Sequence, residues 1–218
     1  MKRLRAGCFV GVAALIVTSC SGFGPTVVGS GNAQTEQRTD GSFTKVSFEE
    51  AIKATVIVGP DVTISVTTDD NVLANVKTTV VAGKLSVNID GNVMPRTPVT
   101  VAITVPVLDD AEASSAASLT VTGVNSGSFS ATAASAATLI VRGNADSVDV
   151  KVDSAASADL GDVPAQTATV KASSAGRTTV NAQVSVSGSV DSGAVVTVEG
   201  NPPSVNVATN SGGVVVRD

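Results

Sequence analysis

Segments led by serine recur along the second half of this chain at nearly constant spacing. The repeat reads SAASLTV from Ser115 and SAATLIV from Ser135, and looser copies begin at Ser154, Ser174, Ser192 and Ser211. The successive gaps are 20, 19, 20, 18 and 19 residues. A fixed period of this length indicates a repeat architecture in which each unit packs on the next.

Each repeat alternates apolar and polar positions after its serine. The fourth position holds Leu119, Leu139, Ala158, Thr178, Val196 and Val215, and the sixth holds Val121, Val141, Leu160, Val180, Val198 and Arg217. The residue between them is mostly polar, and a turn and a second alternating stretch lead to the next serine. Because successive side chains of a strand point to opposite faces, each repeat predicts two short strands with one buried face.

Two strands and a small-residue corner in about 19 residues predict one coil of a β-solenoid, whose coils stack about 4.8 Å apart. Ala, Ser and Gly suit the corner because a larger residue there would stack on itself in every coil. A disordered Ala/Ser/Thr-rich stalk would show no phase in the Val and Leu positions. A β-sandwich spaces its strands more closely, without a repeated corner. The pattern therefore favours the solenoid over both alternatives.

The first half of the chain alternates without the period. Strands at 56–58 and 62–66 flank the turn residues Gly59-Pro60-Asp61, which predicts a β-hairpin. Asp69-Asp70-Asn71 predicts the cap of one helical turn through 72–76. The first half is thus strand-rich but less regular.

The two halves are predicted to form a single all-β domain. No linker rich in Pro and Gly separates them, so residues 29–110 are expected to supply the first, less regular coils. The chain has five Phe and no Trp or Tyr. Its core must be built from Val, Ile, Leu and Ala, and Val with Thr favours strands.

The N-terminus carries a targeting signal. Lys2, Arg3 and Arg5 precede an apolar stretch at 6–17, which is too short to span a bilayer but is typical of a signal peptide. The stretch ends in Val17-Thr18-Ser19-Cys20, which resembles the lipobox of bacterial lipoproteins. An ordinary secretory signal, with Cys20 as a free thiol, is the alternative.

The lipobox divides the chain into three parts. Residues 1–19 are predicted to be a lipoprotein signal peptide, residues 20–28 a flexible tether, and residues 29–218 the folded domain. The Cys20 thiol would carry a diacylglyceryl group and hold the protein on a membrane. The expected location is the bacterial cell envelope, at the outer membrane, the cell surface or the periplasmic face.

Composition excludes several classes of function. The chain has no histidine, which excludes Ser-His triads, Cys-His dyads and histidine-bound metals. Its net charge of −5 and the lack of a basic patch argue against a nucleic-acid partner. No catalytic residue, metal ligand or cofactor is therefore assigned, and the protein is not expected to be an enzyme.

Two patterns could still carry chemistry. Ser42-Phe43-Thr44-Lys45 matches the Ser-x-x-Lys motif of penicillin-binding enzymes, but its companion motifs are missing and the segment reads as a strand. We interpret it as a chance match. The densest acidic cluster comprises Asp146, Asp149, Asp153, Asp159 and Asp162. Such carboxylates could bind Ca²⁺, or they could simply form a solvated face.

Several segments, taken in order, resemble one protein family. They are Gly29-Ser30-Gly31-Asn32, Phe43-Thr44-Lys45-Val46, Asp69-Asp70-Asn71-Val72-Leu73, the Ser-Ala-Ala or Ser-Gly corners, Gly200-Asn201-Pro202 and Ser211-Gly212-Gly213-Val214. Over about residues 29–218 the chain resembles the head GIN domain family, bacterial envelope proteins also described as autotransporter adhesin heads. The resemblance implies a right-handed parallel β-helix. The family's corners usually read Ser-Gly-Ser-Gly-Asp, whereas here Ala replaces most of the glycines.

Together these observations predict a non-catalytic lipoprotein. Its solenoid surface would bind an envelope glycan or protein, and its N-terminal lipid would bind the membrane. The alternative is a β-helix carbohydrate-active enzyme, a polysaccharide lyase or hydrolase, which would need clustered acids and a base in a cleft. Folding upon Ca²⁺ binding is a further possibility.

Overall fold

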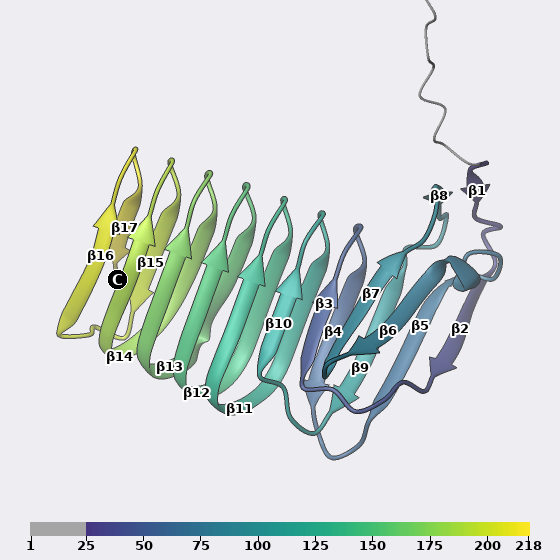
Figure 1. The fold of residues 1–218 in the computed structure, drawn as a ribbon, viewed down its shortest axis with the longest axis horizontal. Helices are drawn as coiled ribbons and strands as arrows, with labels where there is room; N and C mark the ends of the chain where they lie inside the picture. The colour runs from purple at the N-terminus through teal and green to yellow at the C-terminus, as the bar shows by residue number, and fades with distance from the viewer. Residues whose placement is uncertain (1–24) are drawn as a thin grey trace, which may run out of the picture.

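The computed structural model describes residues 25–218. The predicted signal peptide, Cys20 and most of the predicted tether lie outside the described residues. The described chain forms coils that stack in a row, with strands running along both sides (Figure 1). One continuous apolar cluster runs between the two sides, so the predicted single all-β domain is confirmed.

The central coils are long strands that bend halfway along. They are β11 (Ser118–Ala133), β12 (Thr138–Val152), β13 (Ser157–Ala172) and β14 (Arg177–Val190). Each pairs in parallel with the next, and the register joins Ser118, Thr138, Ser157 and Arg177. Three shorter strands complete the last coils: β15 (Val195–Glu199), β16 (Ser204–Thr209) and β17 (Val214–Arg217). The spacing in the sequence therefore predicts the register, and the β-solenoid is confirmed.

The bends divide the strands into two sheets that face each other across the core. Sheet I holds the strand that follows each corner, and it continues through β4 (Lys53–Val58). Sheet II holds the strand that precedes each corner, and it continues through β10 (Asp110–Ala113) and β3 (Lys45–Phe48). Each coil thus contributes one strand segment to each sheet.

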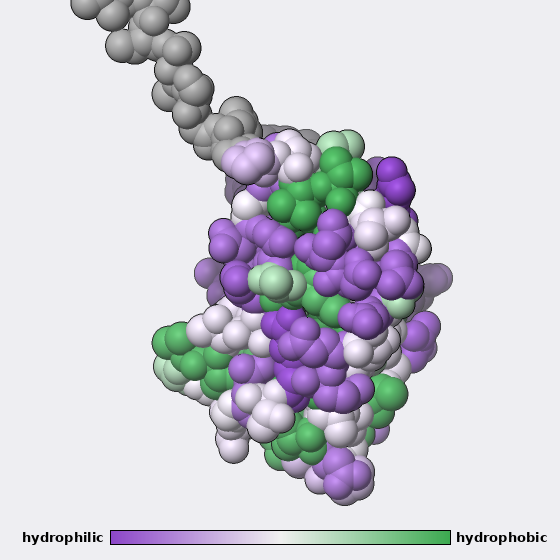
Figure 2. Space-filling model, turned by 90° about the vertical axis from the view of Figure 1, so that its right-hand side faces the viewer, coloured by the Kyte–Doolittle hydropathy of each residue, from purple (hydrophilic) through white to green (hydrophobic). Residues whose placement is uncertain are grey.

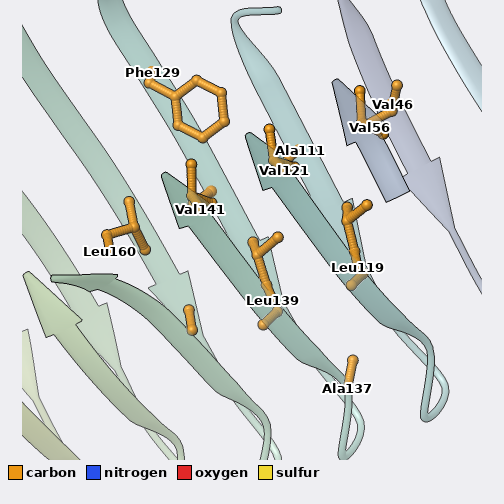
Figure 3. Packing of buried hydrophobic residues seen from close by; sticks show 14 of the residues in the cluster. Val46, Val56, Ala111, Leu119, Val121, Phe129, Ala137, Leu139, Val141 and Leu160 are labelled. Atoms are coloured by element: carbon orange, nitrogen blue, oxygen red, sulfur yellow. The ribbon is translucent and has the colours of Figure 1, made fainter. Parts of the chain in front are cut away.

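Equivalent apolar residues form columns along the core. One column contains Leu119, Leu139, Ala158, Thr178 and Val196, and the next contains Val121, Val141, Leu160, Val180 and Val198. All ten are buried, and Figure 3 shows Leu119 and Leu139 side by side on neighbouring coils. The Thr178 hydroxyl is the exception in its column, because it is buried without a hydrogen-bond partner among the described residues.

The corners are tight turns with two residues in the left-handed conformation. In the corner Ser114–Ala117, Ser115 and Ala116 have φ of 53° and 63°, and the Ala117 N–H donates to the Ser114 carbonyl over 3.0 Å. The Ala116 N–H donates to the Ser135 carbonyl of the next corner over 2.9 Å. The same turn occurs at 49–52, 114–117, 134–137, 153–156, 173–176, 191–194 and 210–213. Small residues suit these positions because bulky side chains are disfavoured at positive φ.

The coil stacked before the corner at 49–52 has a longer connection in place of the tight turn. β7 (Lys84–Ile89) pairs in parallel with β3, and β9 (Thr100–Val105) pairs in parallel with β4. The link between β7 and β9 runs through residues 90–99 and contains β8 (Val93–Met94). β8 pairs in parallel with β1 (Val27–Val28), so the last two residues of the range predicted as a tether belong to a strand.

Antiparallel strands close the N-terminal end of the solenoid. β6 (Val76–Val81) pairs with β7, β5 (Thr63–Asp69) pairs with β9, and β2 (Ala33–Arg38) pairs with β5. The hairpin predicted at 59–61 is wrong, because β9 lies between β4 and β5. β4 must pair with the neighbouring coil on each side, so residues 59–62 carry the chain past β9.

The predicted helical turn is present as a short 3-10 helix, η1 (Leu73–Asn75). The Val72 N–H donates to the backbone carbonyl of Asp69 over 2.9 Å, and no side chain caps η1. Asp69 does not act as the predicted side-chain cap. Within residues 25–218, no helix is long and apolar enough to cross a membrane.

The core columns yield a stability prediction for Leu139→Ala. Leu139 is fully buried between its equivalents in adjacent coils, so truncation should lower the free energy of unfolding by about 2–5 kcal/mol. Ile140→Ala on the outer face is the matched control, with an expected loss below about 1 kcal/mol. Urea unfolding followed by circular dichroism measures both, and equal losses would contradict the assignment of faces.

Candidate functional site

The acidic cluster predicted at 146–162 does not form one site. Asp149 points outward from sheet II, and Asp159 points outward from sheet I, on the opposite side of the molecule. Asp146 lies at the bends, where it lines a hollow of about 310 Å³ together with two Asn and two Gln side chains. Asp162 forms an exposed ion pair with Arg142 at 3.0 Å. Among the described residues, no group of three or more acidic or cysteine side chains could hold a metal ion.

Asp153 has a structural role at a corner. Its Oδ1 accepts hydrogen bonds from the Ser154 N–H at 2.6 Å and from the Ser173 hydroxyl at 3.0 Å. The hydroxyls of Ser174 and Ser173 and the Ser154 N–H lower the pKa of Asp153. The carboxylate therefore joins its own corner to the next one.

The Ser-x-x-Lys segment provides no nucleophile. Ser42 is an exposed loop residue, and Lys45 is the first residue of β3. The motif requires its serine at the start of a helix, and this segment leads into a strand instead. The interpretation as a chance match agrees with this placement.

The outer face of sheet II carries interspersed charges. Lys84 donates to Glu112 over 2.7 Å, and this bond raises the pKa of Lys84. Burial raises the pKa of the adjacent Asp110, with a further contribution from the charge of Glu112. Lys45 lies beside Lys84 and Asp110 in the same row. Charges of both signs share this face, so it offers no uniform field to a charged partner.

The outer face of sheet I is different, because rows of hydroxyl groups cover its N-terminal part. The register places Thr100, Lys53, Ser118, Thr138 and Ser157 in one row. A shallow hollow of about 260 Å³ lies across these strands. Its polar lining residues are Lys53, Thr55, Ser65, Thr67, Thr100, Ser118 and Thr120.

A second hollow of about 280 Å³ lies on the same face, further along the solenoid. Arg177 and Asp159 line it together with Ser157, Thr179 and Thr197. The two hollows share one face of neighbouring coils. We define this face by the lining residues of both hollows and call it the hydroxyl face. It can form hydrogen bonds to an extended ligand that follows the coils. Alternation in the sequence predicts that these residues point outward, but it does not reveal the hollows.

A buried carboxylate fastens the N-terminal segment to the cap. Asp69 is fully buried, and its oxygens accept from the N–H groups of Gly31 at 3.0 Å and Arg96 at 2.7 Å. They also accept from the N–H of Thr97 and from its hydroxyl at 2.8 Å. Burial alone would raise the pKa of Asp69, but the bonds from Thr97, Arg96 and Gly31 outweigh it and lower the pKa. We call Gly29–Asn32, Asp69–Asn71 and Arg96–Thr97 the clasp.

Asp70 and Asn71 complete the clasp. The hydroxyl of Ser30 donates to Asp70 over 2.6 Å and the amide of Asn32 donates over 2.9 Å, and both lower the pKa of Asp70. Asn71 donates to the Val28 carbonyl over 2.9 Å. A Cβ at Gly29 would lie 1.9 Å from Oδ2 of Asp69, so only glycine fits there. Two of the segments that carry the family resemblance therefore meet in space.

Comparison with known proteins identifies the fold. Residues 42–202 match the family described as "Putative auto-transporter adhesin, head GIN domain". No curated protein matches the chain. The likeness to solved structures lies at 14–15% sequence identity, so it speaks for the fold alone.

Three of these structures come from Bacteroides and Parabacteroides species. A "putative adhesin" from Bacteroides fragilis NCTC 9343 has a TM-score of 0.68 at 14% identity, over 88% of this chain and 100% of that one. A "putative lipid binding protein" from Parabacteroides distasonis ATCC 8503 has a TM-score of 0.59 at 14% identity, over 89% of this chain and 100% of that one. A "putative adhesin" from Parabacteroides merdae ATCC 43184 has a TM-score of 0.55 at 15% identity, over 88% of this chain and 99% of that one.

The clasp predicts a loss of stability in acid. Asp69 and Asp70 have lowered pKa values in the folded state, so both carboxylates stabilise the fold above the ordinary carboxyl pKa. This stabilisation disappears as the pH falls through the pKa values of the folded state. Asp69→Asn should lower the melting temperature at pH 7. The difference from the wild type should shrink as the pH falls below the ordinary carboxyl pKa of about 3.9 and through the lower folded pKa, because the wild-type carboxyl then also becomes protonated. Thermal melts at pH 7 and over a series of more acidic pH values measure this, and a difference independent of pH would contradict the role of the charge.

Proposed function

This chain belongs to the head GIN domain family, and we propose that it is a non-catalytic, lipid-anchored envelope protein that binds an envelope polysaccharide through the hydroxyl face. The observation that carries the proposal is the pair of hollows on one face of neighbouring coils. The coils repeat at about 4.8 Å, so a chain-like ligand meets similar groups at each step.

The chemistry of the hydroxyl face suits a neutral or weakly charged polysaccharide. Thr and Ser hydroxyls both donate and accept hydrogen bonds, as sugar hydroxyls do. Lys53 lies in the first hollow, and Arg177 with Asp159 lies in the second, so each hollow adds charge-assisted bonds. Shallow hollows of this size hold part of a polymer rather than enclosing a small molecule.

The dispersed acids favour binding over catalysis. Glycoside hydrolysis commonly uses two carboxyl groups that flank the scissile bond. Asp149 and Asp159 lie on opposite faces, and Asp153 holds a corner together. The second hollow is lined by one carboxylate, Asp159. This arrangement supports the non-catalytic reading over the lyase or hydrolase alternative.

The relatives support an adhesion-like role on the cell envelope. The family's description names an adhesin, as do the descriptions of the structures from B. fragilis and P. merdae. The structure from P. distasonis is described as lipid binding. We extend the envelope location to this chain, with Cys20 as the acylated residue, on the basis of the lipobox at 17–20.

Thr120→Lys tests the binding face. Thr120 lines the first hollow and points outward from β11, so a long charged side chain should obstruct the hollow without entering the core. Thr132→Lys is the matched control, because Thr132 points outward from the same strand on sheet II. Retention of the purified protein on immobilised envelope polysaccharides should fall on the order of tenfold for Thr120→Lys and remain unchanged for Thr132→Lys.

Two results would contradict this proposal. Equal retention of both variants would exclude the hydroxyl face as the binding surface. Release of reducing ends from the polysaccharide by the wild-type protein, abolished by Asp159→Ala, would instead favour the enzyme alternative.

A further inference from the structure

An apolar surface lies at the N-terminal end of the solenoid, next to the first described residues. Val28 in β1 and Met94 in β8 are direct neighbours in the pairing of the two strands, and they are 52% and 62% exposed. Figure 2 views this end of the molecule and shows a green patch beside the point where the described chain begins. Adjacent exposed apolar side chains on a small protein commonly mark a contact surface.

A groove of about 470 Å³ is lined by Val93 and Pro95, the residues on either side of Met94. It lies between the longer connection at 90–99 and the first tight corner, and its apolar lining residues are Ala51, Ile89, Val93, Pro95, Pro98 and Val99. The hollows of the hydroxyl face are lined mainly by Ser and Thr, so this groove differs from them in chemistry. Its one charged lining residue, Glu50, is already engaged by the backbone N–H of Ile89.

The patch is held rigidly in place. The Val27 N–H donates to the Asn92 carbonyl over 2.9 Å, and the Gly29 N–H donates to the Met94 carbonyl over 2.9 Å. The clasp fixes the residues that follow, through Asp69 and Asp70. Apolar side chains on such a fixed scaffold form a persistent surface, and their exposure to water is unfavourable unless a partner covers them.

The length of chain before the patch indicates what that partner is. Thr26 contacts Asn92 at the edge of the groove, since the Asn92 amide donates to its hydroxyl over 2.7 Å. Thr26 is the sixth residue after Cys20, so a lipid on Cys20 keeps the patch within roughly 20 Å of the bilayer. The last coil lies at the far end of the stack, six corner-to-corner steps of about 4.8 Å away.

We propose that Val28, Met94 and the adjoining groove contact the lipid bilayer that holds the anchor, so that the solenoid stands on the membrane by its N-terminal end. The inference rests on the proposed acylation of Cys20. Arg96 is exposed beside the patch and suits the headgroup layer, where a long cationic side chain keeps its charge in water. In this orientation the hydroxyl face runs parallel to the bilayer normal and faces sideways, where it is open to ligands.

Depth-dependent quenching tests the contact. The full-length chain is expressed in a bacterium, recovered with detergent and reconstituted in phosphatidylcholine vesicles. Met94→Cys carries an environment-sensitive fluorophore, and Val216→Cys in the last coil is the matched control, because Val216 is a similarly exposed apolar residue at the other end. Acyl-chain-brominated phosphatidylcholine should quench the label at 94 several-fold more than the label at 216, and only the label at 94 should shift to the blue.

Flotation of the vesicles distinguishes a failure of the proposed lipid anchor from a failure of the proposed membrane contact. Protein that floats with the vesicles but shows equal quenching at both positions retains its anchor and overturns the membrane contact. A blue-shifted label at 94 that brominated lipid does not quench would indicate a protein partner, such as a second copy, and would also overturn it. Protein that does not float overturns the proposed anchor, and the membrane contact falls with it. Circular dichroism of each variant confirms that the fold is retained.

Discussion

In-register parallel pairing of successive coils is the constraint on which the rest of the structure depends. Because each coil lies about 4.8 Å above the last, every side chain stacks on its equivalent in the next coil. Inward positions must therefore repeat a similar volume, as Leu119 and Leu139 do. Corners must repeat two left-handed residues, as Ser115 and Ala116 do. Outward positions become rows, and the hydroxyl face is one consequence.

The parts of the fold that repeat could be predicted from sequence, and the parts that occur once could not. The serine spacing predicts the register, and the alternation predicts the core columns. The serine spacing does not predict the corner at 49–52, because glutamate replaces serine there and the next corner lies 65 residues further on. The sequence pattern does not predict the clasp either, because Asp69 contacts Gly31 and Thr97, which lie 38 and 28 residues away in sequence. Likewise, outward alternation predicts Thr120 on the surface, but only the three-dimensional arrangement reveals the hollow beside it.

The two ends and two faces of the solenoid differ in ways that suit an anchored binding protein. The N-terminal end is closed by antiparallel strands and fastened by Asp69 to the residues that lead toward Cys20. Sheet II carries charges of both signs on its outer face, such as the Lys84–Glu112 pair, and sheet I carries hydroxyls. The proposed binding face and the proposed anchor thus lie on separate parts of one scaffold.

Deletion of one whole coil tests the stacking most directly. Removing residues 135–153 joins Ala134 to Ser154, which restores a complete corner and keeps every remaining strand in register. We expect this variant to unfold cooperatively in urea, with a slightly smaller dependence on denaturant than the wild type, because one coil fewer is buried. Removing residues 135–144, about half a coil, should abolish the cooperative transition because it shifts the register. A half-coil deletion that folds as well as the whole-coil deletion would contradict the account.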